Sequence, residues 1–170
     1  MKKILLLLFI ATLGISAQEH DYSHHLGIFL GGTSGTYAHG HSAFTIGLEY
    51  EYMLNHEMPG VGIGFIAESV MFDETELIFG LPVFLHVYKG LKFYMAPSVI
   101  YTSDWEDHRK YDGTGEYEME PFHEQTRFFM RFGTGYSIHA GRFAVTPTIA
   151  ADIISAKLYV VYGIDFAITF

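Results

Sequence analysis

The chain has 170 residues, no cysteine, a formal net charge of −9 and an aromatic content of 16%. Its acidic balance argues against a nucleic-acid partner, which would need a basic surface. Without cysteines no disulfide can hold the fold, so stability must come from a core, from strand closure or from lipid. The length suits one domain.

The N-terminus predicts a cleaved signal peptide over residues 1–17. Two lysines precede an apolar stretch at 4–15, and the small residue Ala17 ends the segment. This stretch is too short to cross a bilayer as a helix, and no later apolar run is long enough either. We therefore expect one exported domain over residues 18–170.

Beyond the signal, apolar residues alternate with small or polar ones, a pattern that predicts β-strands with one apolar face. The clearest case is the C-terminal segment, where every second residue from Leu158 to Phe170 is apolar and bulky. The pattern predicts strands at residues 43–54, 61–72, 125–139, 143–153 and 158–170.

Three further segments are rich in strand-forming residues but have apolar side chains on both faces, so their orientation stays open. They are residues 24–33, 76–88 and 91–103. Pro82 and Pro97 each remove a backbone donor from these segments. Lys89-Gly90 nevertheless signals a tight hairpin between two of them. The total is eight strands.

The connections separate into two sets, one for each end of a barrel. One end has residues 55–60, 89–90 and 140–142, and the other end has residues 34–42, 73–75, 104–124 and 154–156. The longest connection belongs to the second set. Outer-membrane barrels have long extracellular loops and short periplasmic turns, so the second end is expected outside the cell.

The size of the side chains indicates which face points inward. An eight-stranded barrel has room for little more than its own side chains, so we expect the face rich in small residues inside and the bulky face against lipid. A soluble periplasmic ligand-binding barrel, with the bulky face inside, is the alternative. The inward face is predicted to carry a polar network formed by Glu49, Glu51, Glu68, Arg127, Arg131, Asp152 and Asp165. A turn centred on Gly141-Arg142 would place Arg131 opposite Asp152 as an ion pair.

The C-terminal strand resembles the final strand of bacterial outer-membrane proteins, which ends in a phenylalanine and is recognised by the barrel-assembly machinery. The residues that carry this resemblance are Tyr162, Ile164, Phe166, Ile168 and Phe170. With the signal peptide and eight strands, the whole mature chain resembles the small OmpA/OmpX-type barrels. The resemblance implies an all-β, eight-stranded, antiparallel, up-and-down transmembrane β-barrel. It would be a monomer in contact with outer-membrane lipid of a Gram-negative envelope.

Two groups of side chains invite hypotheses of site chemistry. Histidines cluster at residues 20–25, and His39 and His41 lie in the first loop, but the two groups belong to opposite ends of the barrel. Ser137 and His139 share a face, as a nucleophile and its base would. That face is expected in the lumen, however, where lipid cannot reach. We therefore expect no catalytic residue, metal or cofactor.

The loop at residues 104–124 is the segment most suited to an extracellular ligand. It is strongly acidic, with aromatic residues between the charges, and Asp112-Gly113 could turn a protruding hairpin. We expect a structural or surface-binding barrel that acts through its loops and has no wide pore. A lipid-active outer-membrane enzyme and a narrow transporter remain alternatives.

Overall fold

The structure, a computed structural model, describes residues 22–34, 42–71, 75–102, 109–111, 117–119 and 125–170. No helix among them is long and apolar enough to cross a membrane. The strands are β1 (His24–Ser34), β2 (Ala43–Asn55), β3 (Gly60–Met71), β4 (Thr75–Gly80), β5 (Val83–Tyr88), β6 (Leu91–Thr102), β7 (Arg109–Tyr111), β8 (Tyr117–Met119), β9 (Gln125–Tyr136), β10 (Ile138–Ala140), β11 (Phe143–Ile154) and β12 (Lys157–Thr169).

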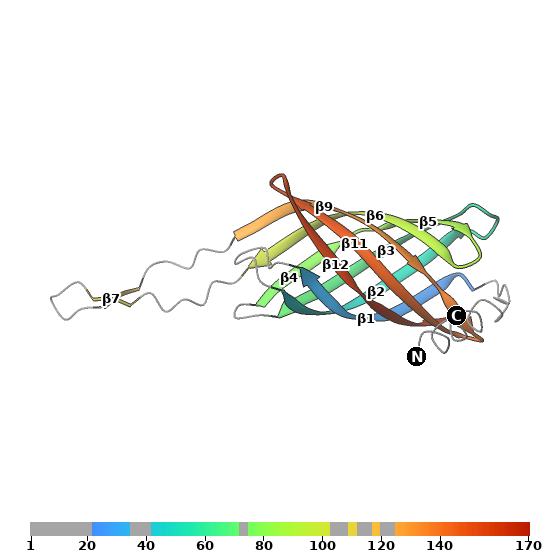
Figure 1. Ribbon diagram of the computed structural model, residues 1–170, viewed down its shortest axis with the longest axis horizontal. Coiled ribbons are helices and arrows are strands. Elements are labelled where there is room, and N and C mark those ends of the chain that lie inside the picture. The colour runs from blue at the N-terminus through green and yellow to red at the C-terminus, as the bar shows by residue number, and fades with distance from the viewer. Residues whose placement is uncertain (1–21, 35–41, 72–74, 103–108, 112–116, 120–124) are drawn as a thin grey trace, which may run out of the picture.

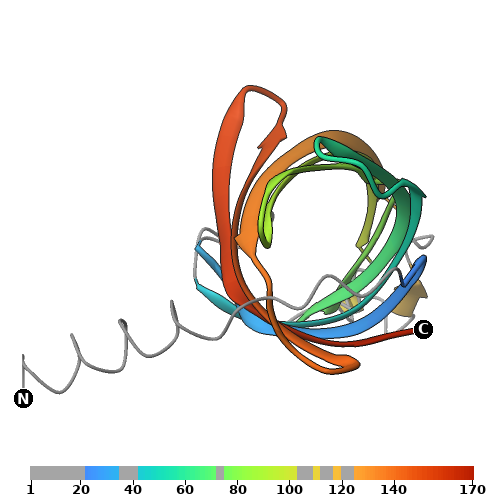
Figure 2. The ribbon, with the colours of Figure 1, turned by 90° about the vertical axis from the view of Figure 1, so that its right-hand side faces the viewer.

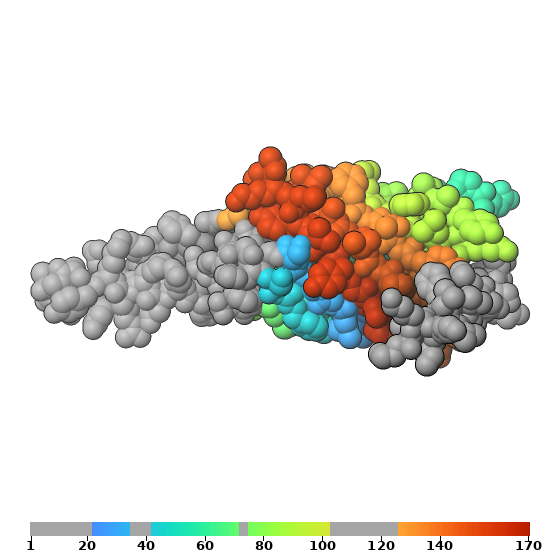
Figure 3. All heavy atoms as spheres, in the orientation of Figure 1, coloured from blue at the N-terminus to red at the C-terminus, as the bar shows by residue number. Residues whose placement is uncertain are grey.

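Ten of these strands form one antiparallel sheet that closes on itself, because β12 pairs with β1 (Figures 1 and 2). In this sheet β4 and β5 are two parts of one barrel strand, and so are β9 and β10. The result is a barrel of eight strands, which confirms the predicted fold class. Figure 3 shows the C-terminal strands, in red, directly beside the N-terminal strands, in blue.

The two divided strands differ from the prediction, which has each as one continuous segment. The first break falls at Leu81-Pro82, where the proline has no N–H to give to the ladder. Its carbonyl still accepts a hydrogen bond from Gly64 N at 2.9 Å, so the sheet stays joined across the break. The second break falls at Ser137, whose N–H donates to the Gly90 carbonyl at 2.7 Å.

Short turns join the strands at one end of the barrel, which we name the turn end. Gly90 and Gly141 each have a positive φ there, 88° and 64°, as two-residue hairpin turns require. The opposite end, the loop end, carries the two longest connections, and also a two-residue turn at Ser155-Ala156, where both residues have a positive φ. Strands β7 and β8 pair only with each other beyond the loop end, within the predicted hairpin (Figure 1). The turn of that hairpin lies outside the described residues.

Large apolar side chains of every full-length barrel strand point outward and are exposed. Examples from the three strands whose orientation the sequence leaves open are Ile28, Phe79 and Phe93. No Asp, Glu, Lys or Arg occupies an outward position within these strands; those residues lie inward or at strand ends. A soluble barrel would need the reverse arrangement, so the chain is a transmembrane barrel.

The inward face is more apolar than the sequence analysis predicts. Small and charged residues are present, but they are joined by two clusters of buried apolar side chains. The first is Phe29, Ile66, Phe84, Tyr94, Ala96, Ala150 and Val161. The second, nearer the loop end, is Ala43, Val70, Ile78, Ile100, Phe129 and Ile154. Three of the four aromatic members, Phe29, Phe84 and Tyr94, come from the strands whose orientation the sequence leaves open.

Glycines on neighbouring strands make room for these inward rings. A Cβ atom added to Gly133 would lie 2.2 Å from the ring of Tyr94, its cross-strand neighbour. A Cβ atom added to Gly163 would lie 2.6 Å from the ring of Phe29. A Cβ atom does not approach a carbon atom of another residue this closely in a real structure. The glycines of the inward face are therefore the space into which its aromatic rings fit.

We expect Gly133→Val to lower the free energy of unfolding by about 1–3 kcal/mol, because overfilling a packed interior costs this much. Urea titration of the refolded protein in detergent micelles measures the change. In a Tyr94→Leu background the ring is gone, so Gly133→Val should cost clearly less. An equal cost in both backgrounds would show that the ring does not limit the space.

Candidate functional site

Six of the seven residues predicted for the interior network lie inside the barrel, in two groups. Glu68, Arg131 and Asp152 form the first group, in the middle of the barrel, and all three are buried. Glu49, Glu51 and Asp165 belong to the second, nearer the turn end. The seventh, Arg127, occupies an inward position of β9 but is exposed, because it lies near the strand's end at the barrel rim.

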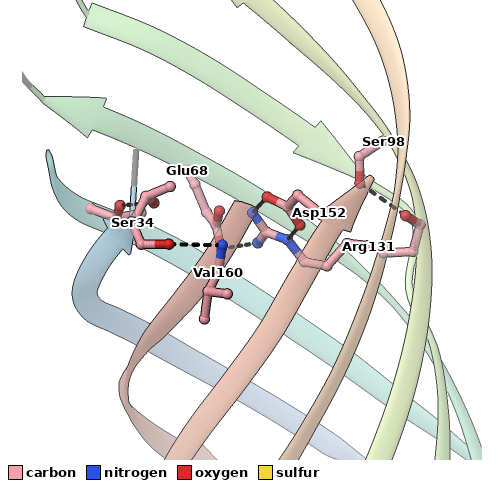
Figure 4. A network of polar contacts seen from close by, with 9 residues as sticks. Ser34, Glu68, Ser98, Arg131, Asp152 and Val160 are labelled. Atoms are coloured by element: carbon pink, nitrogen blue, oxygen red, sulfur yellow. Dashed lines mark hydrogen bonds and ion pairs between the residues drawn. The ribbon is translucent and has the colours of Figure 1, made fainter. Parts of the chain in front are cut away.

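The middle group is a three-residue ion cluster centred on Arg131 (Figure 4). Arg131 Nε and Nη2 donate to the two carboxylate oxygens of Asp152, at 2.6 and 2.9 Å. Arg131 Nη1 donates to Glu68 Oε1 at 2.6 Å. Asp152 lies directly opposite Arg131 on the adjacent strand, as the register of the hairpin predicts. Glu68 comes from β3, so the cluster also bridges the lumen.

Because this cluster is buried, its contribution to stability depends on how well the charged groups are aligned. Arg131 is 1% exposed and Asp152 is 0% exposed. Removing charges from water is costly, and the cost is offset only when each charge meets a well-placed partner. The planar guanidinium provides such a match, with two parallel bonds to one carboxylate and a third to another. The cluster ties β3, β9 and β11 together across the interior.

The second group is centred on Lys92, a residue that the sequence analysis does not place. Lys92 Nζ lies 2.6 Å from Glu49 Oε1 and 3.7 Å from Glu51 Oε2, so it bridges β6 and β2. It also lies 4.8 Å from the centre of the Phe84 ring. His86 of β5 pairs with Glu51 through its Nε2 atom.

A signal for Lys92 is present in the sequence. A lysine within a strand is costly against lipid, which favours the inward face for Lys92 and would have oriented β6. The orientation of β5 could not be found in the same way. A two-residue turn at Lys89-Gly90 would pair Lys92 with Val87, whereas a bulge between His86 and Tyr88 shifts the register and pairs Lys92 with His86.

The histidine and serine hypotheses do not gain support from the described part of the chain. His24 points outward and His25 inward, because adjacent strand residues face opposite sides. Ser137 Oγ lies 2.9 Å from Thr146 Oγ1, while the ring of His139 lies edge-on to His25. The described residues contain no group of three metal-ligand side chains. His20, His39 and His41 lie outside the described residues.

A small cavity lies between the two charged groups. It has a volume of about 10 Å³ and is lined by residues that include Glu49, Glu68, Tyr94 and Arg131. This is room for about one water molecule. Around it the interior carries the buried side chains of the two apolar clusters and of the two charged groups.

We expect Arg131→Met to lower the free energy of unfolding by about 3–5 kcal/mol, because it leaves two buried carboxylates without their cation. Denaturant titration in micelles measures the loss. Arg127→Met is the matched control, since Arg127 lies on the same face of the same strand but is exposed, and it should cost under about 1 kcal/mol. Equal losses for both variants would contradict the role of the cluster.

Comparison with known proteins identifies the fold. No protein-family model and no curated protein sequence matches the chain. The N-terminal β-barrel domain of Pseudomonas aeruginosa OprF matches with a TM-score of 0.59 and 13% identity, over 86% of this chain and 97% of that one. Yersinia pestis Ail, in complex with the heparin analogue sucrose octasulfate, matches with a TM-score of 0.55 and 7% identity, over 86% and 97% of the two chains.

Neisserial surface protein A matches with a TM-score of 0.50 and 8% identity, over 86% of this chain and 96% of that one. Identities this low concern the fold and leave activity open. The chain has the fold of the small eight-stranded outer-membrane β-barrels.

Proposed function

We propose that the protein is an integral outer-membrane barrel that acts outside the cell through its long loop at residues 104–124, as a binding or structural surface. The observation that carries this proposal is the contrast between a filled barrel and one long, polar connection. A filled interior has no path for a solute. The loop is then the part of the chain best placed to meet a partner.

The location in the outer membrane is supported by two observations. The outward face is apolar around the barrel, and the solved structures that match the fold include outer-membrane proteins. The signal peptide predicted at residues 1–17 lies outside the described residues and stays a prediction. So does the monomeric state.

The charge of the loop favours a cationic partner. Within residues 104–124 the sequence has eight acidic residues and two basic ones. The Ail structure contains a sulfated heparin analogue, which is an anion. A ligand with that negative charge would be repelled by the acidic residues of 104–124. Attraction of a positively charged peptide or protein segment is the electrostatic complement, and it should weaken with salt.

An enzyme is the second class considered, and the described residues give it no geometric support. Nucleophilic catalysis needs a base within hydrogen-bond reach of the nucleophile, and the hydroxyl of Ser137 is bonded to a threonine instead. Ser137 and His139 also lie on the inward face of the barrel, away from lipid.

Binding of a fluorescent lysine oligomer to the purified barrel in micelles tests the partner class. Replacing the acidic residues of 104–124 with their amides should reduce binding at low salt by at least about tenfold, because the attraction is electrostatic. As a matched variant, Arg109→Gln with Lys110→Gln makes the loop more negative and should strengthen binding. An affinity for the lysine oligomer that is the same in the wild type and in both variants would overturn the proposed charge selectivity.

Protease added to intact cells tests the orientation. Cleavage within residues 104–124, with the strands preserved, is expected because nicking concentrates in long exposed loops. Mass spectrometry of the fragments locates the cut. Cleavage that appears only after the envelope is broken would mean that the loop end faces the periplasm.

Deleting Phe170 tests the predicted assembly signal formed by the outward residues of β12. The deletion removes the terminal aromatic residue and its two backbone hydrogen bonds to His24, at 3.0 and 2.9 Å. We expect the truncated chain to be depleted from the outer-membrane fraction, measured by immunoblotting. Normal levels there would contradict the assembly role of this strand.

A further inference from the structure

Asp165 of β12 is a buried carboxyl group that has no opposite charge in direct contact. The residue is 3% exposed and points into the barrel. Its Oδ1 atom is buried and has no hydrogen-bond partner among the residues that the structure describes. The two buried cations of the interior, Arg131 and Lys92, form their ion pairs with other carboxylates. Asp165 therefore belongs to the group around Lys92 without an ion pair of its own.

The carboxyl group of Asp165 lies against β1, in the place that a side chain of Gly27 would occupy. A Cβ atom added to Gly27 would lie 2.7 Å from Asp165 Oδ2 and closer still to Oδ1. Gly27 pairs directly with Glu49 of β2. Opposed side-chain positions of an antiparallel pair are about 5 Å apart. The carboxyl group of Asp165 is thus directed across β1 towards a second acid.

The groups that surround Asp165 carry more negative than positive charge. The residues directly opposite it on the two adjacent strands, Phe29 and Thr146, are uncharged. The titratable side chains on the same inward face nearby are His25 of β1, Glu49 and Glu51 of β2, His86 of β5 and Lys92 of β6. Lysine is the one among these that stays positively charged throughout the neutral pH range, and it already contacts two carboxylates. An ionised Asp165 would add a third.

We propose that Asp165 binds a proton at neutral pH and faces the lumen as a neutral carboxylic acid. A buried charge without a partner costs so much free energy that the group is usually neutralised instead. A proton achieves this without further ligands. A metal ion would need several, and the described residues contain no group of three metal-ligand side chains. The proton also removes the repulsion between Asp165 and Glu49.

The position of Asp165 gives this proton a role in closing the barrel. Asp165 lies in the stretch of β12 that pairs with β1 at the seam between the first and the last strand. Loss of the proton would place an unpaired negative charge at that seam, on the same side as Glu49. The protonated form therefore favours the closed barrel, and the ionised form opposes closure.

Infrared spectroscopy of the refolded barrel in micelles tests the proton directly, because a carboxylic acid and a carboxylate have different C–O stretching bands. At neutral pH the wild type should show a carboxylic-acid band that Asp165→Asn lacks. Glu57→Gln is the matched control, since it removes an exposed carboxylate at the turn end, and it should leave this band unchanged. Carboxylic-acid bands of equal strength in the wild type and in Asp165→Asn would overturn the proposal.

The pH dependence of unfolding is the second test. In the unfolded chain Asp165 loses its proton above about pH 4, whereas the folded barrel keeps it. Unfolding then releases a proton, so the stability that Asp165 contributes falls as the pH rises. Urea titrations between about pH 5 and about pH 9 should show Asp165→Asn gaining stability relative to the wild type. The ratio of their folding constants should rise by up to about tenfold per pH unit until Asp165 ionises in the folded barrel.

Taking this ratio cancels the titration of His25, His86 and the other groups that both proteins contain. Glu57→Gln should give a ratio to the wild type that stays constant over the same pH range. A constant ratio for Asp165→Asn as well would show that Asp165 is ionised in the folded barrel, and the proposal would be wrong.

Discussion

The interior volume of an eight-stranded barrel is small, and the other features of this molecule depend on that limit. Bulky side chains fit inside only where a neighbouring strand gives up its own side chain, as Gly133 does for Tyr94. The remaining bulky residues have no room inside and cover the outer surface. A membrane accepts that surface because lipid sets no limit on side-chain volume.

Most charges in so narrow a space meet an opposite charge in direct contact, since little water can enter to screen them; buried Asp165 is an exception, with one carboxylate oxygen that has no hydrogen-bond partner among the described residues. Arg131 meets two carboxylates and Lys92 meets two more, so each cation joins strands from opposite sides of the lumen. These contacts fix the distance between distant strands, whereas the ladders fix only neighbours. The strand ladders close the barrel, and the charged contacts across the lumen also determine the shape of its cross-section.

Alternation in the sequence predicts the strands and the fold because lipid and a tight interior favour different side-chain sizes. It fails where the interior is apolar too: in β4 and β5, Ile78 and Phe84 point inward although their outward neighbours are equally apolar. The sequence analysis does not place Lys92 in the interior for the same reason, since its strand has apolar side chains on both faces. Alternation also says nothing of depth, so it does not distinguish the exposed Arg127 from the buried Arg131.

The seam between β1 and β12 joins the two ends of almost the whole described chain. Bringing such distant segments together has a high entropic cost, and that cost must be met before their hydrogen bonds form. Until β12 arrives, the growing sheet keeps two open edges, which are templates for pairing with other chains. Closure of this barrel therefore requires the pairing of β1 with β12, and any delay in that step leaves both edges of the sheet open to pairing with other chains.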